Sequence, residues 1–228
     1  MTRTRAVVVP LLSILAALVL LAGAGPAAAQ PRPPAADAVS LPDAIDQGLV
    51  RAEFSGTGSA SGASLLLRVA RTSPDDLAIT VPLGLLVLNA DDAEQDMVVR
   101  QLLGASAGGS SYRPAAAIEL RDDDEHVFIL EAYCLEAHLD NPSRGVAFSA
   151  NGFVHPDVIA VLEAVDRVPD ADEEIEVIQA AVWAITDDIS AGELDDIDYS
   201  LNERETQLVA DILRAAGFDP ARFRLFGG

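Results

Sequence analysis

The most reactive side chain of this 228-residue chain belongs to Cys134, its only cysteine. A thiolate is a strong nucleophile and a metal ligand, whereas a buried thiol behaves as a small hydrophobic group. The first residues of the chain predict an export signal, and exported proteins usually pair their cysteines in disulfides. Cys134, however, has no partner within the chain. Three roles are therefore open to Cys134: an inert buried thiol, an intermolecular link, or a group with chemistry of its own.

A second residue with an unusual setting is Gln179. Gln179 and Trp183 are four residues apart, so they share one face of an expected helix. That face adjoins an aliphatic stripe that includes Ile178 and Val182. A buried amide must find hydrogen-bond partners, so a glutamine beside a core stripe needs a specific partner in the fold.

Two short motifs contain these residues and together resemble a known family. Residues 133–136 read Tyr-Cys-Leu-Glu, and residues 178–183 read Ile-Gln-Ala-Ala-Val-Trp. Both resemble motifs of the thioester domains of Gram-positive surface adhesins, which carry them in the same order. The motifs depart from that family in their spacing and in one residue. The motifs lie closer together than is usual there, and Ile178 stands where a threonine is usual.

The resemblance implies an internal thioester between Cys134 and Gln179, with the cysteine on a β-subdomain and the glutamine on a helical one. Attack of the thiolate on the Gln179 amide carbonyl would release ammonia and leave a thioester bond. This bond is a masked electrophile that amines can open. Tyr133 and Trp183 would shield the bond from water, and Glu136 completes the first motif. The chain contains no lysine, so it has no side-chain amine that would attack the thioester within the same molecule. These features predict a binding or adhesion module rather than an enzyme.

Other chemistry at Cys134 has weaker support. His138 lies four residues away, with His126 and His155 as the remaining histidines. Zinc prefers four ligands at compact spacing, and blue copper usually needs a methionine close behind, whereas Met97 lies upstream. We therefore expect no metal and no cofactor. A cysteine hydrolase that pairs Cys134 with His138 or His155 is the less favoured alternative, and a noncatalytic structural or interaction domain is the main one.

The first residues predict an export signal. Arg3 and Arg5 precede the apolar run 6–24, and the three alanines at 27–29 give a small-x-small pattern that places cleavage before Gln30. The apolar run is also just long enough for an uncleaved membrane anchor, which is the rival interpretation. We expect cleavage, and a secreted or otherwise extracytoplasmic protein with no membrane contact afterwards.

Charge excludes two classes of partner. The net charge is −21, and nucleic acids and anionic membranes both require a basic face. We therefore expect a surface or protein partner, whose identity the sequence leaves open together with the oligomeric state. The acidic run at 195–198 lacks the glycine and the final glutamate of an EF-hand loop, so only loose calcium binding is open to it.

The elements that must position these residues divide the chain in two. Residues 30–48 are rich in proline and alanine and read as a leader. Short apolar segments separated by turn residues over 49–150 predict an antiparallel β-sandwich. Residues 151–228 predict a small helical subdomain of about three helices, packed on the sandwich. Its second helix would be capped by Asp170 with Glu173 and its third by Asn202 with Glu205, so the fold class is α+β.

Overall fold

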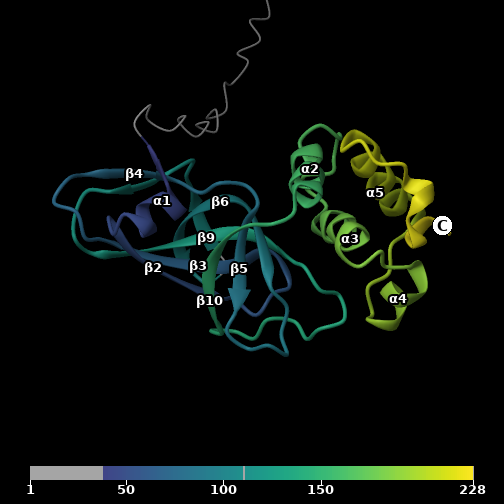
Figure 1. Cartoon of the computed structure of the whole chain (residues 1–228), viewed down its shortest axis with the longest axis horizontal. Helices are drawn as coiled ribbons and strands as arrows, with labels where there is room; N and C mark the ends of the chain where they lie inside the picture. Colours follow the sequence, from purple (N-terminus) through teal and green to yellow (C-terminus); the bar gives the residue numbers. More distant parts are fainter. Residues whose placement is uncertain (1–37, 110, 228) are drawn as a thin grey trace, which may run out of the picture. The chain divides into compact units, whose positions relative to one another are not determined.

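The structure is a computed structural model that describes residues 38–109 and 111–227 (Figure 1). The predicted signal peptide, 1–29, lies outside the described residues. The described strands are β1 (Val39–Ser40), β2 (Val50–Gly56), β3 (Ser61–Arg71), β4 (Leu77–Thr80), β5 (Leu85–Asn89), β6 (Met97–Gly108), β7 (Ser111–Pro114), β8 (Ile118–Leu120), β9 (Glu125–Cys134) and β10 (Ala147–Phe153). The described helices are α1 (Leu41–Asp46), α2 (Pro156–Val165), α3 (Ile175–Thr186), α4 (Ala191–Asp196) and α5 (Glu203–Ala215), followed by the short 3-10 turns η1 (Pro220–Arg222) and η2 (Arg224–Phe226).

The predicted β-sandwich is wrong, because the main sheet closes on itself. Its strands follow the order β5–β10–β2–β3–β9–β6, and β5 pairs with β6 as well as with β10. This pairing makes a closed six-stranded antiparallel barrel, which removes the edge strands that two separate sheets would have left open. The hairpin strand β7 extends from β6, and β1, β4 and β8 form a separate small sheet.

The register of the barrel sorts its side chains between an inner and an outer face. Met97 lies opposite Cys134 on one side and Val87 on the other, so these three side chains share a face. All three are fully buried. The neighbouring residue of β5, Leu86, instead lines an open cavity, which marks its face as the outer one. Cys134 therefore points into the barrel.

Four helices, rather than about three, follow β10, because the short helix α4 forms between the second and third predicted ones. Figure 1 shows these helices gathered beside the barrel, and α3 contacts β9 and β3 directly. Asn202 and Glu205 form the expected capping box at the start of α5. The predicted Asp170 cap is wrong: α3 begins at Ile175 after Glu174, and no side chain caps it.

The segment predicted as a leader includes α1. Ser40 caps this helix through its hydroxyl, and Leu41 and Ala44 are completely buried against the small sheet and its neighbours. Among the described residues, no helix is both long enough and apolar enough to cross a membrane.

Candidate functional site

Cys134 lies at the end of β9, at a point where one side of the strand has lost its neighbour. Leu135 N–H donates to Asp96 O beside β6, so the N–H and C=O of Cys134 point the other way, toward β3. However, β3 begins only at Ser61, which pairs with Tyr133. The backbone of Cys134 therefore reaches beyond the ladder of β3 and needs other partners.

The amide of Gln179 provides both partners. Cys134 N–H donates to Gln179 Oε1 at 3.0 Å, and Gln179 Nε2 donates to Cys134 O at 2.8 Å. Both residues have no exposed surface. The Gln179 side chain thus replaces the missing strand, and the residues of the two sequence motifs meet.

A close approach of α3 to the barrel makes this contact available. Ile175, one helical turn before Gln179, packs on Gly62 near the start of β3. A Cβ atom at Gly62 would lie 2.8 Å from Ile175 Cδ1, and Gly62 has a φ of +71° that also favours glycine. Farther along, Ala137 N–H donates to Asp187 Oδ2 at 3.0 Å, which ties the chain after β9 to the end of α3.

The two hydrogen bonds also fix the orientation of the Gln179 amide relative to the Cys134 backbone. They align the plane of the amide with the hydrogen-bonding plane of the sheet, whereas the Cys134 side chain stands roughly perpendicular to that plane. A nucleophile adds to a carbonyl carbon from above or below its plane, so a thiol has to approach the amide from one of its faces. The Cys134 N–H, aimed at Oε1, is placed to stabilise negative charge that develops on this oxygen.

Burial strongly affects the two titratable groups of the first motif. Burial, and then the negative charge of Glu136, raise the pKa of the Cys134 thiol well above its ordinary value. Burial, followed by repulsion from Asp96 and Asp187, raises the pKa of Glu136 to about 7, although Glu136 accepts a hydrogen bond from Asp96 N–H. The free thiol is therefore neutral at physiological pH, and Glu136 can exchange a proton there.

An open cavity of about 350 Å³ adjoins Glu136. Three carboxylates line it, from Asp96, Glu136 and Asp187, and its apolar wall includes Leu135 and Phe153. Its mixed lining suits a cation with an apolar stem, such as an alkylammonium group.

Tyr133 is anchored on the outer face by a buried ionic network. Its hydroxyl donates to Glu131, which also accepts from Arg100 Nη1 at 2.9 Å and from Gln101 Nε2. Arg100 also pairs with Asp166 at the end of α2. Side-chain exposure is only 5% for Arg100 and 8% for Glu131, so Tyr133 is fixed by a desolvated charge pair.

Trp183 is 2% exposed and lies edge-on to Tyr199, with 5.1 Å between ring centroids. Tyr199 is itself tied to α3, because its hydroxyl donates to Glu176 O at 2.8 Å. Trp183 Nε1 is buried without a hydrogen-bond partner among the described residues. Trp183 and Tyr199 thus form an aromatic layer over α3, one turn beyond Gln179.

The histidines lie away from the thiol. His155 caps α2, with its ring 72% exposed, His126 lies 2.7 Å from Asp122 Oδ1, and His138 is exposed. Each of the three lies in the described part of the chain, and none hydrogen-bonds to Cys134. Within residues 38–109 and 111–227, no group of three or more His, Cys, Asp or Glu side chains is arranged to hold a metal ion.

The raised pKa of Glu136 predicts a pH-dependent stability. The stabilising contribution of its protonated form is full below its ordinary pKa and is lost as pH rises through about 7. Glu136→Gln removes this loss, so the variant should match the parent at pH 4 and exceed it at pH 8. After allowance for solvent screening, we expect about 1 kcal/mol, or a Tm higher by about 2–4 °C at pH 8.

Thermal unfolding at the two pH values measures the effect. Glu163→Gln, at an exposed position of α2, provides a control with the same change of side chain. An equal gain for both variants at pH 8 would contradict the assignment to Glu136.

Comparisons of the chain with protein-family models, with curated proteins and with solved structures gave no match.

Proposed function

We propose that this chain is an exported binding module in which Cys134 and Gln179 form an internal thioester that acylates an amine on a partner. The observation that carries this proposal is the pair of hydrogen bonds between the Gln179 amide and the Cys134 backbone. They hold the Gln179 amide against the backbone of the residue that carries the only thiol of the chain. The resemblance of the two motifs to thioester domains supports the same reaction.

Formation of the bond needs only groups of the site. The Cys134 sulfur bonds to Gln179 Cδ, the Cδ–Nε2 bond breaks, and the thiol proton leaves with the nitrogen as ammonia. The Cys134 N–H stabilises the oxygen during the addition. Glu136, whose pKa of about 7 permits both protonation states, is suited to carry the proton.

The same burial that disfavours the thiolate favours the thioester. A thioester carries no charge, so the desolvation that raises the pKa of the Cys134 thiol does not penalise it. A thiol with a raised pKa is also a poor leaving group, which slows hydrolysis. Tyr133 and Trp183 are almost completely buried, so they help to exclude water from the surroundings of the bond.

An amine of the partner would first bind in the cavity beside Glu136, whose lining does not include Cys134 or Gln179. The carboxylates of Asp96, Glu136 and Asp187 attract its ammonium form, and Glu136 can accept a proton from it. The amine nitrogen then bonds to Gln179 Cδ, the Cδ–S bond breaks, and the proton lost by the amine ends on the Cys134 sulfur. The result is a stable amide between the module and its partner.

Reaction with a fluorescent primary amine tests this function. We expect one label per chain, bound at Gln179, and the appearance of one titratable thiol for each label. Cys134→Ala and Gln179→Ala should take up no label. Labelling that persists in Cys134→Ala, or a wild-type protein that takes up no label, would contradict the proposal.

The alternative is a noncatalytic interaction domain in which Gln179 only joins α3 to the barrel. The complete pairing of the Cys134 backbone and the raised pKa of its thiol favour this role. In that case the freshly purified protein, unfolded in denaturant, should give one full equivalent of free thiol before any amine is added. The thioester proposal requires much less than one equivalent of free thiol in that measurement.

A further inference from the structure

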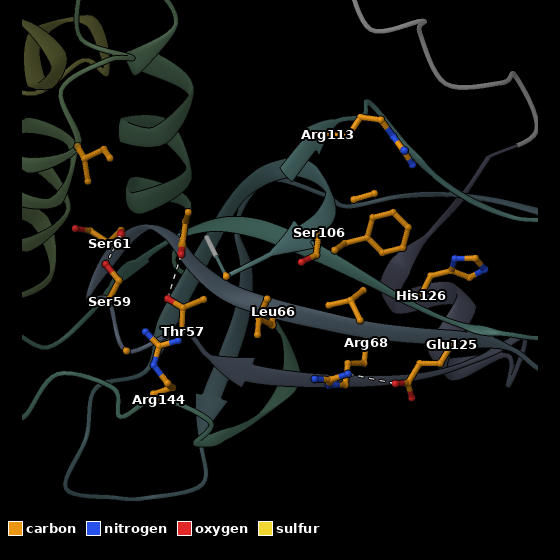
Figure 2. Close-up of a pocket in the computed structure, with 17 residues that line it drawn as sticks. Thr57, Ser59, Ser61, Leu66, Arg68, Ser106, Arg113, Glu125, His126 and Arg144 are labelled. Atoms are coloured by element: carbon orange, nitrogen blue, oxygen red, sulfur yellow. Dashed lines mark hydrogen bonds and ion pairs between the residues drawn. The ribbon is translucent and has the colours of Figure 1, made fainter. Parts of the chain in front are cut away.

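A groove of about 1070 Å³ lies over the outer wall of the barrel, away from the cavity beside Glu136 (Figure 2). Strands β3 and β9 contribute Leu66 and Phe128 to its lining, the β2–β3 connection contributes Thr57, Gly58 and Ser59, and the β6–β7 hairpin contributes Ser106 and Arg113. Hydroxyl groups and small apolar side chains therefore line much of its surface.

Positive charge is concentrated in this groove, although the chain as a whole carries a net charge of −21. Arg68, Arg113 and Arg144 line it, and Glu125, the one carboxylate among its described lining residues, lies 3.4 Å from Arg68. Among the described residues, no carboxylate lies within ion-pair distance of Arg113 or Arg144. In so acidic a protein, two exposed and unpaired guanidinium groups that line one groove are placed to meet negative charge from outside.

The backbone at both arginines is fixed by close contacts with glycines. Gly104 has a φ of +152°, and a Cβ atom there would lie 2.1 Å from Arg113 O. Gly58 has a φ of +87°, and a Cβ atom there would lie 3.2 Å from Arg144 Cβ. The loop that carries Arg144 is also held by Gly145 N–H, which donates to Gly56 O at 2.8 Å. The backbone of both arginines thus stands at a defined position, and Figure 2 shows the two side chains on opposite sides of the groove.

We propose that this groove binds a segment of an acidic polysaccharide, with carboxylate or sulfate groups held by Arg113 and Arg144. Guanidinium groups bind such oxyanions through paired hydrogen bonds, and the hydroxyls of Thr57, Ser59 and Ser106 suit sugar hydroxyls.

A peptide partner is less well matched to this lining. Strands β3 and β9 pair with each other, and each has a second neighbour over most of its length, so the groove offers only short stretches of free backbone edge. Among the described lining residues, Ile175 is the only large exposed hydrophobic one, and Phe128 is only 6% exposed, so the groove lacks the exposed aromatic anchors typical of protein interfaces.

Binding of three oligosaccharides, measured by calorimetry at low salt, tests the proposal. Oligogalacturonate carries carboxylates, a heparin-derived oligosaccharide carries sulfates, and maltohexaose is neutral. At least one charged oligosaccharide should bind, more weakly at high salt, and maltohexaose should not. Arg113→Gln and Arg144→Gln should each weaken binding about tenfold, the loss expected for one charge-assisted contact.

Two matched controls locate the site. Arg222→Gln makes the same change at an exposed arginine that does not line the groove, and it should leave the affinity unchanged. Cys134→Ala should also bind normally, so this site is tested separately from the thioester. The proposal is wrong if neither acidic oligosaccharide binds, if Arg222→Gln weakens binding as much as the groove variants, or if polyglutamate binds more tightly than both acidic oligosaccharides.

Discussion

Gln179→Ala, made in a Cys134→Ala background where no thioester can form, is expected to lower the free energy of unfolding by about 3–5 kcal/mol. The Gln179 amide is the partner of Cys134 N–H and of Cys134 O, and the site has no exposed surface. Truncation leaves both backbone groups buried and unpaired, at about 1–3 kcal/mol each. It also opens a cavity where the side chain lay.

Two further variants separate these contributions. Gln179→Met keeps the volume of the side chain but not its hydrogen bonds, so it should recover only the cavity contribution. Glu176→Ala changes an exposed side chain of the same helix and should stay within about 0.5 kcal/mol of its parent. Chemical denaturation measures all three, and a loss below about 1 kcal/mol for Gln179→Ala would contradict the described pairing.

Glu131→Ala is expected to be comparably damaging, with a loss of about 3–5 kcal/mol. The carboxylate of Glu131 accepts from Arg100, Gln101 and Tyr133, and its removal leaves the guanidinium of Arg100 almost fully buried and all three donors without this acceptor. The salt bridge of Arg100 with Asp166, whose side chain is 69% exposed, compensates only in part.

The double variant Arg100→Met with Glu131→Leu provides the decisive comparison. Replacing both charges with apolar side chains leaves no buried charge, so the double variant should be more stable than Glu131→Ala. Urea denaturation of the wild type and the two variants gives the coupling. A double variant less stable than Glu131→Ala would show that the ion pair itself, rather than the cost of an unpaired charge, governs the effect.

Local patterns in the sequence predicted several elements of the fold. Asn202 and Glu205 have the spacing of a capping box, and they form one. The apolar run before Glu136 predicted the strand that ends at Cys134, and the helical spacing around Gln179 predicted α3. Short-range rules work at these places because the interactions that decide the structure are also short-range.

The closure of the barrel was not predictable in this way. It depends on the pairing of β5 with β10, which lies about sixty residues later in the chain. Strand β10, 147–153, is mostly exposed, and its polar residues and glycine conceal the alternation that would identify a strand. Register between distant strands follows from the packing of the whole sheet, which no local pattern encodes.

The buried ion pair left a signal that our prediction did not use. Arg100 and Glu131 each lie within a strongly apolar stretch, where a charged residue is rarely buried without a partner.

The candidate site was predictable from the sequence only in part. The motifs singled out Cys134 and Gln179, but only the late start of β3 explains why the amide lies against the Cys134 backbone.

The intact mass of the freshly purified protein is the most direct test of the thioester. Formation of the bond releases one ammonia, so we predict a mass about 17 Da below that of the unmodified sequence. Cys134→Ala and Gln179→Ala should show their full calculated masses. A wild-type protein at its full calculated mass, with Cys134 titratable in denaturant, would contradict the thioester and leave Gln179 as a structural link between α3 and the barrel.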